Sequence, residues 1–81
     1  MMELREMPME EARMITRHRM LKEYGESLLQ RRKERGITKI ELFERTGVSV
    51  SDISKAELGL FELSEEQKLA IGKFLRRQHI I

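Results

Sequence analysis

Residues 38–59 read TKIELFERTGVSVSDISKAELG, and this stretch decides the fold. It holds the same helix-start pattern twice, a hydroxyl residue followed three positions later by an acid: Thr38 with Glu41, and Ser49 with Asp52. In this pattern, the capping box, the hydroxyl oxygen accepts a hydrogen bond from a free backbone N–H of the first helical turn. The sequence therefore predicts two helices, each beginning just after a hydroxyl residue.

A glycine follows each of these two helices, Gly47 after the first and Gly59 after the second. Glycine readily adopts the left-handed backbone conformation that commonly ends a helix. An apolar residue also precedes each cap, Ile37 before the first and Val48 before the second, and can pack on the helix that follows. Two short helices joined by a tight turn form a helix-turn-helix motif.

The composition limits the class of protein. The chain has 81 residues, enough for one domain with a small core. It contains no cysteine, which excludes disulfides and thiolate metal sites and fits a reducing compartment. No apolar run reaches the roughly 18 residues of a membrane span, and the acidic start MMELREMPMEE does not resemble an export signal. We therefore expect a cytoplasmic protein with no membrane partner.

Charge is distributed unevenly along the chain, although the net charge is only +2. Residues 13–39 carry nine basic side chains against three acids, whereas residues 49–66 carry one base, Lys55, against five acids. Such runs are ordinarily solvated helix faces. The basic segment is compatible with an anionic partner such as nucleic acid but does not by itself require one.

Three further helices are predicted outside the motif, over residues 9–24, 26–35 and 64–77. Gly25 weakens helical structure and is expected to separate the first two. Ser64 and Gln67 form a third capping box, which opens the last helix. The expected fold class is therefore all-α, with five helices.

The chain is expected to divide into an N-terminal extension, a helix-turn-helix domain and an apolar tail, at residues 1–23, 24–77 and 78–81. Near the start, Met14, Leu21 and Leu28 recur every seven residues. This short seam is compatible with a helix packed on its own domain or with contact to a second copy of the chain. The tail offers a second surface for contact between two copies.

These residues resemble the lambda-repressor-like family, the Cro/repressor or xenobiotic-response-element type of helix-turn-helix domain. The resemblance covers about residues 24–75 and lies in the order and spacing of residues 25–32, Gly36, Ile37, Thr38, Leu42, Gly47, Val48, Ile53, Glu57 and Gly59. It implies a five-helix DNA-binding domain that lays the helix at 49–58 in the major groove. It also implies a structural ion pair between Arg32 and Glu57. Both lie on core-facing surfaces, where an unpaired charge would be expensive.

The resemblance further implies which side chains meet DNA. The base-reading candidates are Val50, Ser51 and Lys55, and the phosphate candidates are Lys39, Lys33 and Arg35. Val50 departs from the family, which usually has a long polar side chain here, because valine can only contact a thymine methyl group. Asp52 adds a negative charge beside the expected phosphates, although its place in a capping box already explains it.

Phe43 and Ala56 reverse the residue sizes that the family usually has at these two positions. If the two side chains share one contact, the large one would fill the space left by the small one, which preserves the core volume. We therefore expect Phe43 and Ala56 to exchange volume within the core.

Two functions remain after these considerations. The first is a sequence-specific DNA-binding transcriptional regulator, resembling a phage, mobile-element or bacterial repressor and acting as a dimer. The alternative is a helix-turn-helix module repurposed for protein–protein interaction, accessory or antitoxin-like, which the acidic, valine-bearing second helix favours. Double-stranded DNA is the first expected partner, and a second copy of the chain or another protein is the alternative.

Catalytic and metal-binding functions find no support in the sequence. It contains no phosphate-binding loop, nucleophile elbow or pair of carboxylates placed on a cleft. His18 and His79 stand far apart and have no cysteine partners, so we expect both at the surface. We therefore expect no enzyme activity, no cofactor and no metal.

Overall fold

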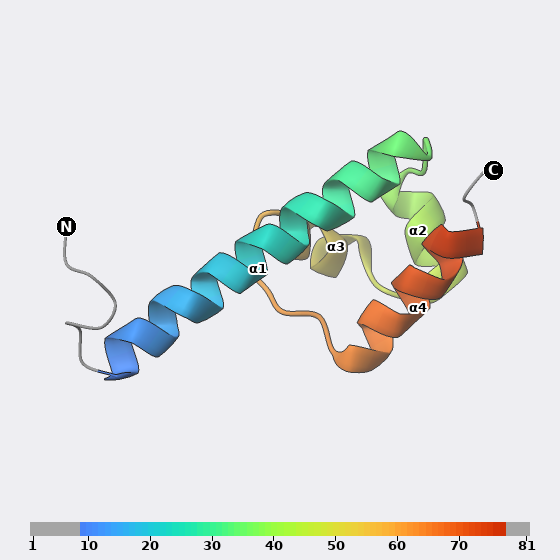
Figure 1. The fold of residues 1–81 in the computed structure, drawn as a ribbon. Helices are drawn as coiled ribbons and strands as arrows, with labels where there is room; N and C mark the ends of the chain where they lie inside the picture. The colour runs from blue at the N-terminus through green and yellow to red at the C-terminus, as the bar shows by residue number, and fades with distance from the viewer. Residues whose placement is uncertain (1–8, 78–81) are drawn as a thin grey trace.

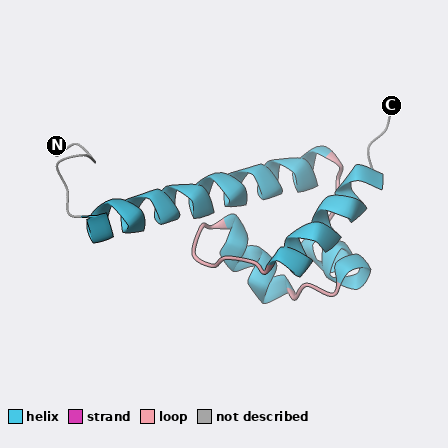
Figure 2. Cartoon of the chain, turned by 60° about the horizontal axis from the view of Figure 1, so that its bottom comes forward, coloured by secondary structure: helices cyan, strands magenta, loops and turns pink. Residues whose placement is uncertain are grey.

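The computed structural model describes residues 9–77, with side chains described from residue 16 onward. Four helices follow one another along the chain: α1 (Met9–Glu34), α2 (Lys39–Thr46), α3 (Val50–Glu57) and α4 (Glu65–Arg77) (Figure 1). The described part contains helices and loops and no strand (Figure 2), so the all-α prediction is confirmed. The predicted tail at 78–81 lies outside the described residues.

The prediction of five helices is wrong, because the two helices expected before the motif are one. α1 runs without a break through Gly25, and the boundary expected at residue 24 falls inside it. Gly25 lies against the backbone of α3: a Cβ added there would overlap the Ala56 carbonyl oxygen and stand 2.8 Å from that of Glu57. This glycine therefore permits close packing of two helices and does not end one.

Replacing Gly25 with alanine is expected to lower the free energy of unfolding by about 2–3 kcal/mol, because the added methyl group forces two helix backbones apart. Gly72→Ala is the matched control, since nothing lies within 4 Å of a Cβ at that position in α4. The control should stabilise the protein by up to about 1 kcal/mol through higher helix propensity. Urea denaturation measures both changes. Equal effects of the two substitutions would contradict the packing role of Gly25.

The two caps of the motif form as predicted. The Thr38 hydroxyl accepts a hydrogen bond from the Glu41 backbone N–H at 3.1 Å, and the Ser49 hydroxyl accepts one from that of Asp52 at 3.0 Å. Gly47 ends α2 with a left-handed φ of 78°, a conformation that a residue with a Cβ adopts only at a cost. The turn between α2 and α3 therefore begins at Gly47, which ends α2, and finishes at the Ser49 cap, which begins α3.

The core is a single cluster in which α1 packs on α3, while α2 packs on both α3 and α4. Its nine buried apolar side chains are Leu28, Ile37, Leu42, Val48, Ile53, Ala56, Leu63, Ile71 and Leu75. The apolar residues that precede the two caps both belong to it. The expected exchange of volume between Phe43 and Ala56 is wrong: Ala56 is fully buried next to the close approach of α1, but Phe43 is 45% exposed.

Helix α4 is attached to the rest of the domain by its own cap and by a bond from α1. Ser64 and Gln67 form the full reciprocal capping box, with hydrogen bonds of 2.8 and 3.1 Å. At the other end of α4, the Arg35 guanidinium donates to the Leu75 carbonyl oxygen at 3.0 Å. Hydrogen bonds thus stabilise the N-terminal end of α4 and tie its C-terminal end to Arg35.

Tyr24 lies between α1 and α4. The Lys68 ammonium stands 5.3 Å from the centre of its ring, a cation–π contact. Burial raises the pKa of the Tyr24 hydroxyl above its ordinary value, an effect that Arg31 opposes and Glu65 reinforces. The hydroxyl is buried and has no hydrogen-bond partner among residues 9–77. Tyr24 therefore acts through its ring as an apolar contact at the edge of the core.

A buried ion pair joins α1 to the C-terminal end of α3. The Arg32 guanidinium donates to the two carboxylate oxygens of Glu57 at 2.7 and 3.1 Å, and its remaining NH₂ group donates to the Ile37 carbonyl oxygen at 3.0 Å. Arg32 is 9% exposed and Glu57 is 8% exposed. Each charge is therefore paired and hydrogen-bonded, which burial of charge requires. One side chain holds together α1, the α1–α2 link and α3.

Glu57→Gln is expected to lower the free energy of unfolding by about 3–5 kcal/mol, since it leaves the Arg32 charge buried without a counter-charge. Arg32→Met combined with Glu57→Leu should recover most of this loss, less the cost of leaving the Ile37 carbonyl unpaired. Urea denaturation of Glu57→Gln, of the single variants Arg32→Met and Glu57→Leu, and of their double variant measures the loss and the coupling.

The exposed pair of Arg17 and Glu62, at 3.2 Å, provides a control. Arg17→Ala should change stability by less than about 1 kcal/mol. A loss from Glu57→Gln as small as that from Arg17→Ala would show that the buried pair does not hold the fold.

Candidate nucleic-acid interface

The outward side of α3 carries the three side chains predicted from the sequence to read bases. Val50 is the first residue of the helix and is 37% exposed, and both Ser51 and Lys55 are exposed. Ser51 and Lys55 are four positions apart and so share one face of the helix. Ile53, on the opposite side, is fully buried in the core. The inner side of α3 is thus used for packing, and its outer side is available to a partner.

Lys39 brings a positive charge to the same region. It is the first residue of α2, and its ammonium donates a hydrogen bond to the Ser54 hydroxyl of α3 at 3.1 Å. An ammonium has three donors, so this bond leaves two for another acceptor. The N-terminus of α2 also carries unpaired backbone N–H groups and the positive end of the helix dipole. The charge is therefore held at a place where an anion would be stabilised.

The two remaining phosphate candidates, Lys33 and Arg35, have different surroundings. Lys33 lies in the last turn of α1 and is exposed. Arg35 is half-buried, and besides its bond to α4 it donates to the Arg31 carbonyl oxygen at 3.0 Å. Arg35 thus has a structural role in closing the end of α1, whereas the Lys33 ammonium is accessible to solvent.

Comparison with protein families identifies this arrangement. The helix-turn-helix family model matches residues 28–78, which include the last two turns of α1 and all of α2, α3 and α4. The chain belongs to the lambda-repressor-like helix-turn-helix family. Members of this family are DNA-binding regulators. Comparisons with curated proteins and with solved structures give no match.

The family match begins inside α1 and covers only part of that helix. Residues 9–27 of α1 precede the match. None of α1 to α4 combines the length and the hydropathy of a membrane-spanning helix.

The charge on the outer side of this helix-turn-helix domain is mixed. Lys55 and Lys39 supply positive charge, and Asp52 supplies negative charge in the first turn of α3. Asp52 has a local reason to be there, because acids in the first turn interact favourably with the helix dipole. The face presents few of the long polar side chains that pair with base edges.

Ser54 is a residue whose position in the site the sequence did not reveal. Its hydroxyl accepts a hydrogen bond from Lys39, which lies 15 positions earlier in the chain. No spacing rule within a helix connects these two residues. Their contact depends on how α2 crosses α3, which is a property of the packed motif.

Proposed function

We propose that this chain is a sequence-specific DNA-binding transcriptional regulator of the repressor type, which acts as a homodimer and lays α3 in the major groove. The observation that carries the proposal is the common location of two features: the exposed side of α3, and the Lys39 ammonium held beside it by Ser54 at 3.1 Å. A recognition helix needs base contacts and phosphate contacts in fixed register, and a hydrogen bond between α2 and α3 supports such a register.

The fixed orientation of α3 also supports the proposal. Its first turn is capped by Ser49, and its last residue is held by Arg32. Gly25 lets α1 approach its C-terminal end closely. A helix fixed at both ends presents its outer side chains in one geometry, which lowers the entropic cost of binding.

In this proposal the contacts have distinct roles. Val50, Ser51 and Lys55 meet base edges, with Val50 contacting a methyl group in the groove. Lys39 and the N-terminus of α2 meet one phosphate. Lys33, exposed at the end of α1, reaches a further phosphate, and Arg35 assists mainly by holding the end of α1 in place.

DNA binding is expected to weaken steeply with salt, because each phosphate contact releases counterions. Lys39→Ala should weaken binding similarly across sequences and reduce the slope of log K against log salt by about 1. Lys55→Ala should also weaken binding. Lys73→Ala, an exposed lysine on α4, is the matched control and should have little effect. Fluorescence anisotropy with duplexes selected from a random pool measures these constants. Binding that does not change with salt would contradict the proposal.

Val50 predicts sensitivity to a single methyl group in the DNA. Replacing the contacted thymine by uracil, which lacks the 5-methyl group, should weaken binding about fourfold, since one buried methyl(ene) is worth about 0.8 kcal/mol. Val50→Ala should bind thymine and uracil duplexes nearly equally, which closes a double-mutant cycle. Substitution of thymines elsewhere in the same duplex is the control. The same affinity for uracil at every position would refute the role of Val50.

A role in protein–protein interaction is the second candidate, and the weak positive charge of α3 favours it. Lys55 is the one cation on that helix, and Asp52 opposes it. On α2, Ile40 is 62% exposed and Phe43 is 45% exposed, so the motif also presents apolar surface. If no duplex is bound even at low salt, this function replaces the proposed one.

A further inference from the structure

The middle of α1 lies directly against the C-terminal end of α3. Two glycines permit this contact, one within α1 and one just after α3. Gly25 of α1 faces the carbonyl oxygens of Ala56 and Glu57, and no Cβ would fit between them. Gly59 faces the backbone of Lys22, and a Cβ added to it would stand 3.0 Å from the Lys22 Cα. Backbone meets backbone at both positions, so no flexible side chain could move aside.

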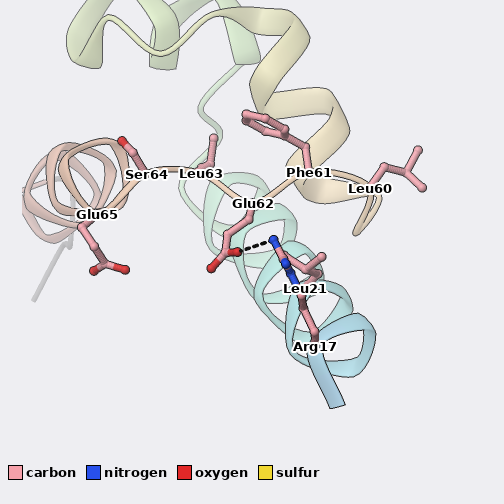
Figure 3. A pocket seen from close by; sticks show the side chains of 8 residues that line it. All are labelled: Arg17, Leu21, Leu60, Phe61, Glu62, Leu63, Ser64 and Glu65. Carbon is pink, nitrogen blue, oxygen red and sulfur yellow. Dashed lines mark hydrogen bonds and ion pairs between the residues drawn. The ribbon is translucent and has the colours of Figure 1, made fainter. Parts of the chain in front are cut away.

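The contact continues along the connector between α3 and α4 (Figure 3). Arg17 of α1 donates a hydrogen bond to the Glu62 carboxylate at 3.2 Å, and Leu21 lines the same groove as Leu60. The partners run in opposite directions, since residues 17, 22 and 25 of α1 meet residues 62, 59 and 56. An exposed ion pair contributes little stability, so the backbone contacts at the two glycines set the spacing between α1 and α3.

Helix α3 is held by two different neighbours. α2 bonds to its middle, through Lys39 and Ser54 at 3.1 Å, whereas α1 holds its last residue, through Arg32 and Glu57 at 2.7 Å. Gly25 stands about two turns before Arg32 and so lies on the same side of α1. The spacing between α1 and α3 can therefore change the position of the C-terminal end of α3 while α2 keeps the rest of the helix in place.

Of the predicted base readers, Lys55 stands nearest to this contact. It precedes Ala56 by one position, whereas Val50 is about 9 Å from Ala56 along the helix axis at about 1.5 Å per residue. Ala56 is fully buried and Lys55 is exposed. A change in spacing at Ala56 therefore moves Lys55 more than it moves Val50. A shift of about 1 Å takes a hydrogen bond outside its normal range of about 2.7–3.2 Å.

We propose that Gly25 and Gly59 position Lys55 for base reading, because they set how closely the C-terminal end of α3 lies to α1. Lys22 and Gly25 precede residue 28, where the family match begins, so the contact is formed partly by residues outside that match. The inference rests on the proposed function, in which Lys55 meets a base edge. It makes the part of α1 before the match a determinant of DNA specificity.

Double-mutant cycles test whether Gly25 acts through Lys55. Lys55→Ala should weaken binding of the selected duplex about tenfold in the unchanged chain, but less than about twofold in Gly25→Ala, where the base contact is already lost. Lys39→Ala should weaken binding by the same factor in both. Fluorescence anisotropy gives the affinities, and circular dichroism under the same conditions gives the folded fraction by which each is corrected. A merely structural role of Gly25 would lower that fraction and leave both factors unchanged.

Gly59→Ala is a second variant, which crowds the same contact from the other side and should reduce the effect of Lys55→Ala in the same way. Gly36→Ala is its matched control: the two glycines have left-handed φ values of 74° and 65°, but nothing lies within 4 Å of a Cβ at Gly36. Gly72→Ala is the matched control for Gly25→Ala. Neither control should change the effect of Lys55→Ala.

An effect of Lys55→Ala that stays the same in Gly25→Ala and Gly59→Ala overturns the inference, as does an equal reduction of that effect in Gly36→Ala. A matching reduction in the effect of Lys39→Ala also overturns it, because the variants would then loosen the whole domain. In each of these outcomes the unchanged chain still binds DNA, so the proposed function stands. If the unchanged chain binds no duplex, the proposed function fails and this inference fails with it.

Discussion

The buried bond between Arg32 and Glu57 is the constraint on which the rest of the structure depends. Both groups are charged and almost fully enclosed, and each is satisfied only if α1, the α1–α2 link and α3 hold one relative position. A misplaced α3 would leave two charges unpaired in the interior, which costs several kcal/mol. Apolar contacts in the core would survive small shifts of these helices, whereas the hydrogen bonds of the ion pair require a defined distance and direction. The position of the recognition helix therefore follows from an ion pair on its inner side.

The inner side of α3 makes the packing contacts with the core, so the fold places little constraint on the exposed side chains of its outer side. Ser49 caps the helix, Ile53 packs in the core and Glu57 anchors the C-terminal end, while the exposed side chains of Val50 and Lys55 do not belong to the buried core. The outer residues can therefore determine specificity without affecting the stability of the domain. They are few and short here, so phosphate contacts near the start of α2 carry a large share of the binding that we propose.

The N-terminal part of α1 lies outside the residues that the family model matches. The match begins at residue 28, yet α1 continues without a break from residue 9 and meets the α3–α4 connector on the way. An unbroken helix transmits its orientation rigidly from the core to its projecting end.

The caps of the motif and the glycines after its helices could be predicted from the sequence, because they depend on hydrogen bonds within a few residues. The ion pair of Arg32 and Glu57 could be predicted from the resemblance to a family. Three features could not be predicted without the packed structure: Gly25 lies within a helix, Phe43 is exposed, and Lys39 is bonded to Ser54. Each of these depends on how closely two helices approach, and helix propensity carries no information about a neighbour distant in sequence. A single glycine lowers the stability of a helix, but the helix continues when close packing against another backbone offsets that free-energy cost.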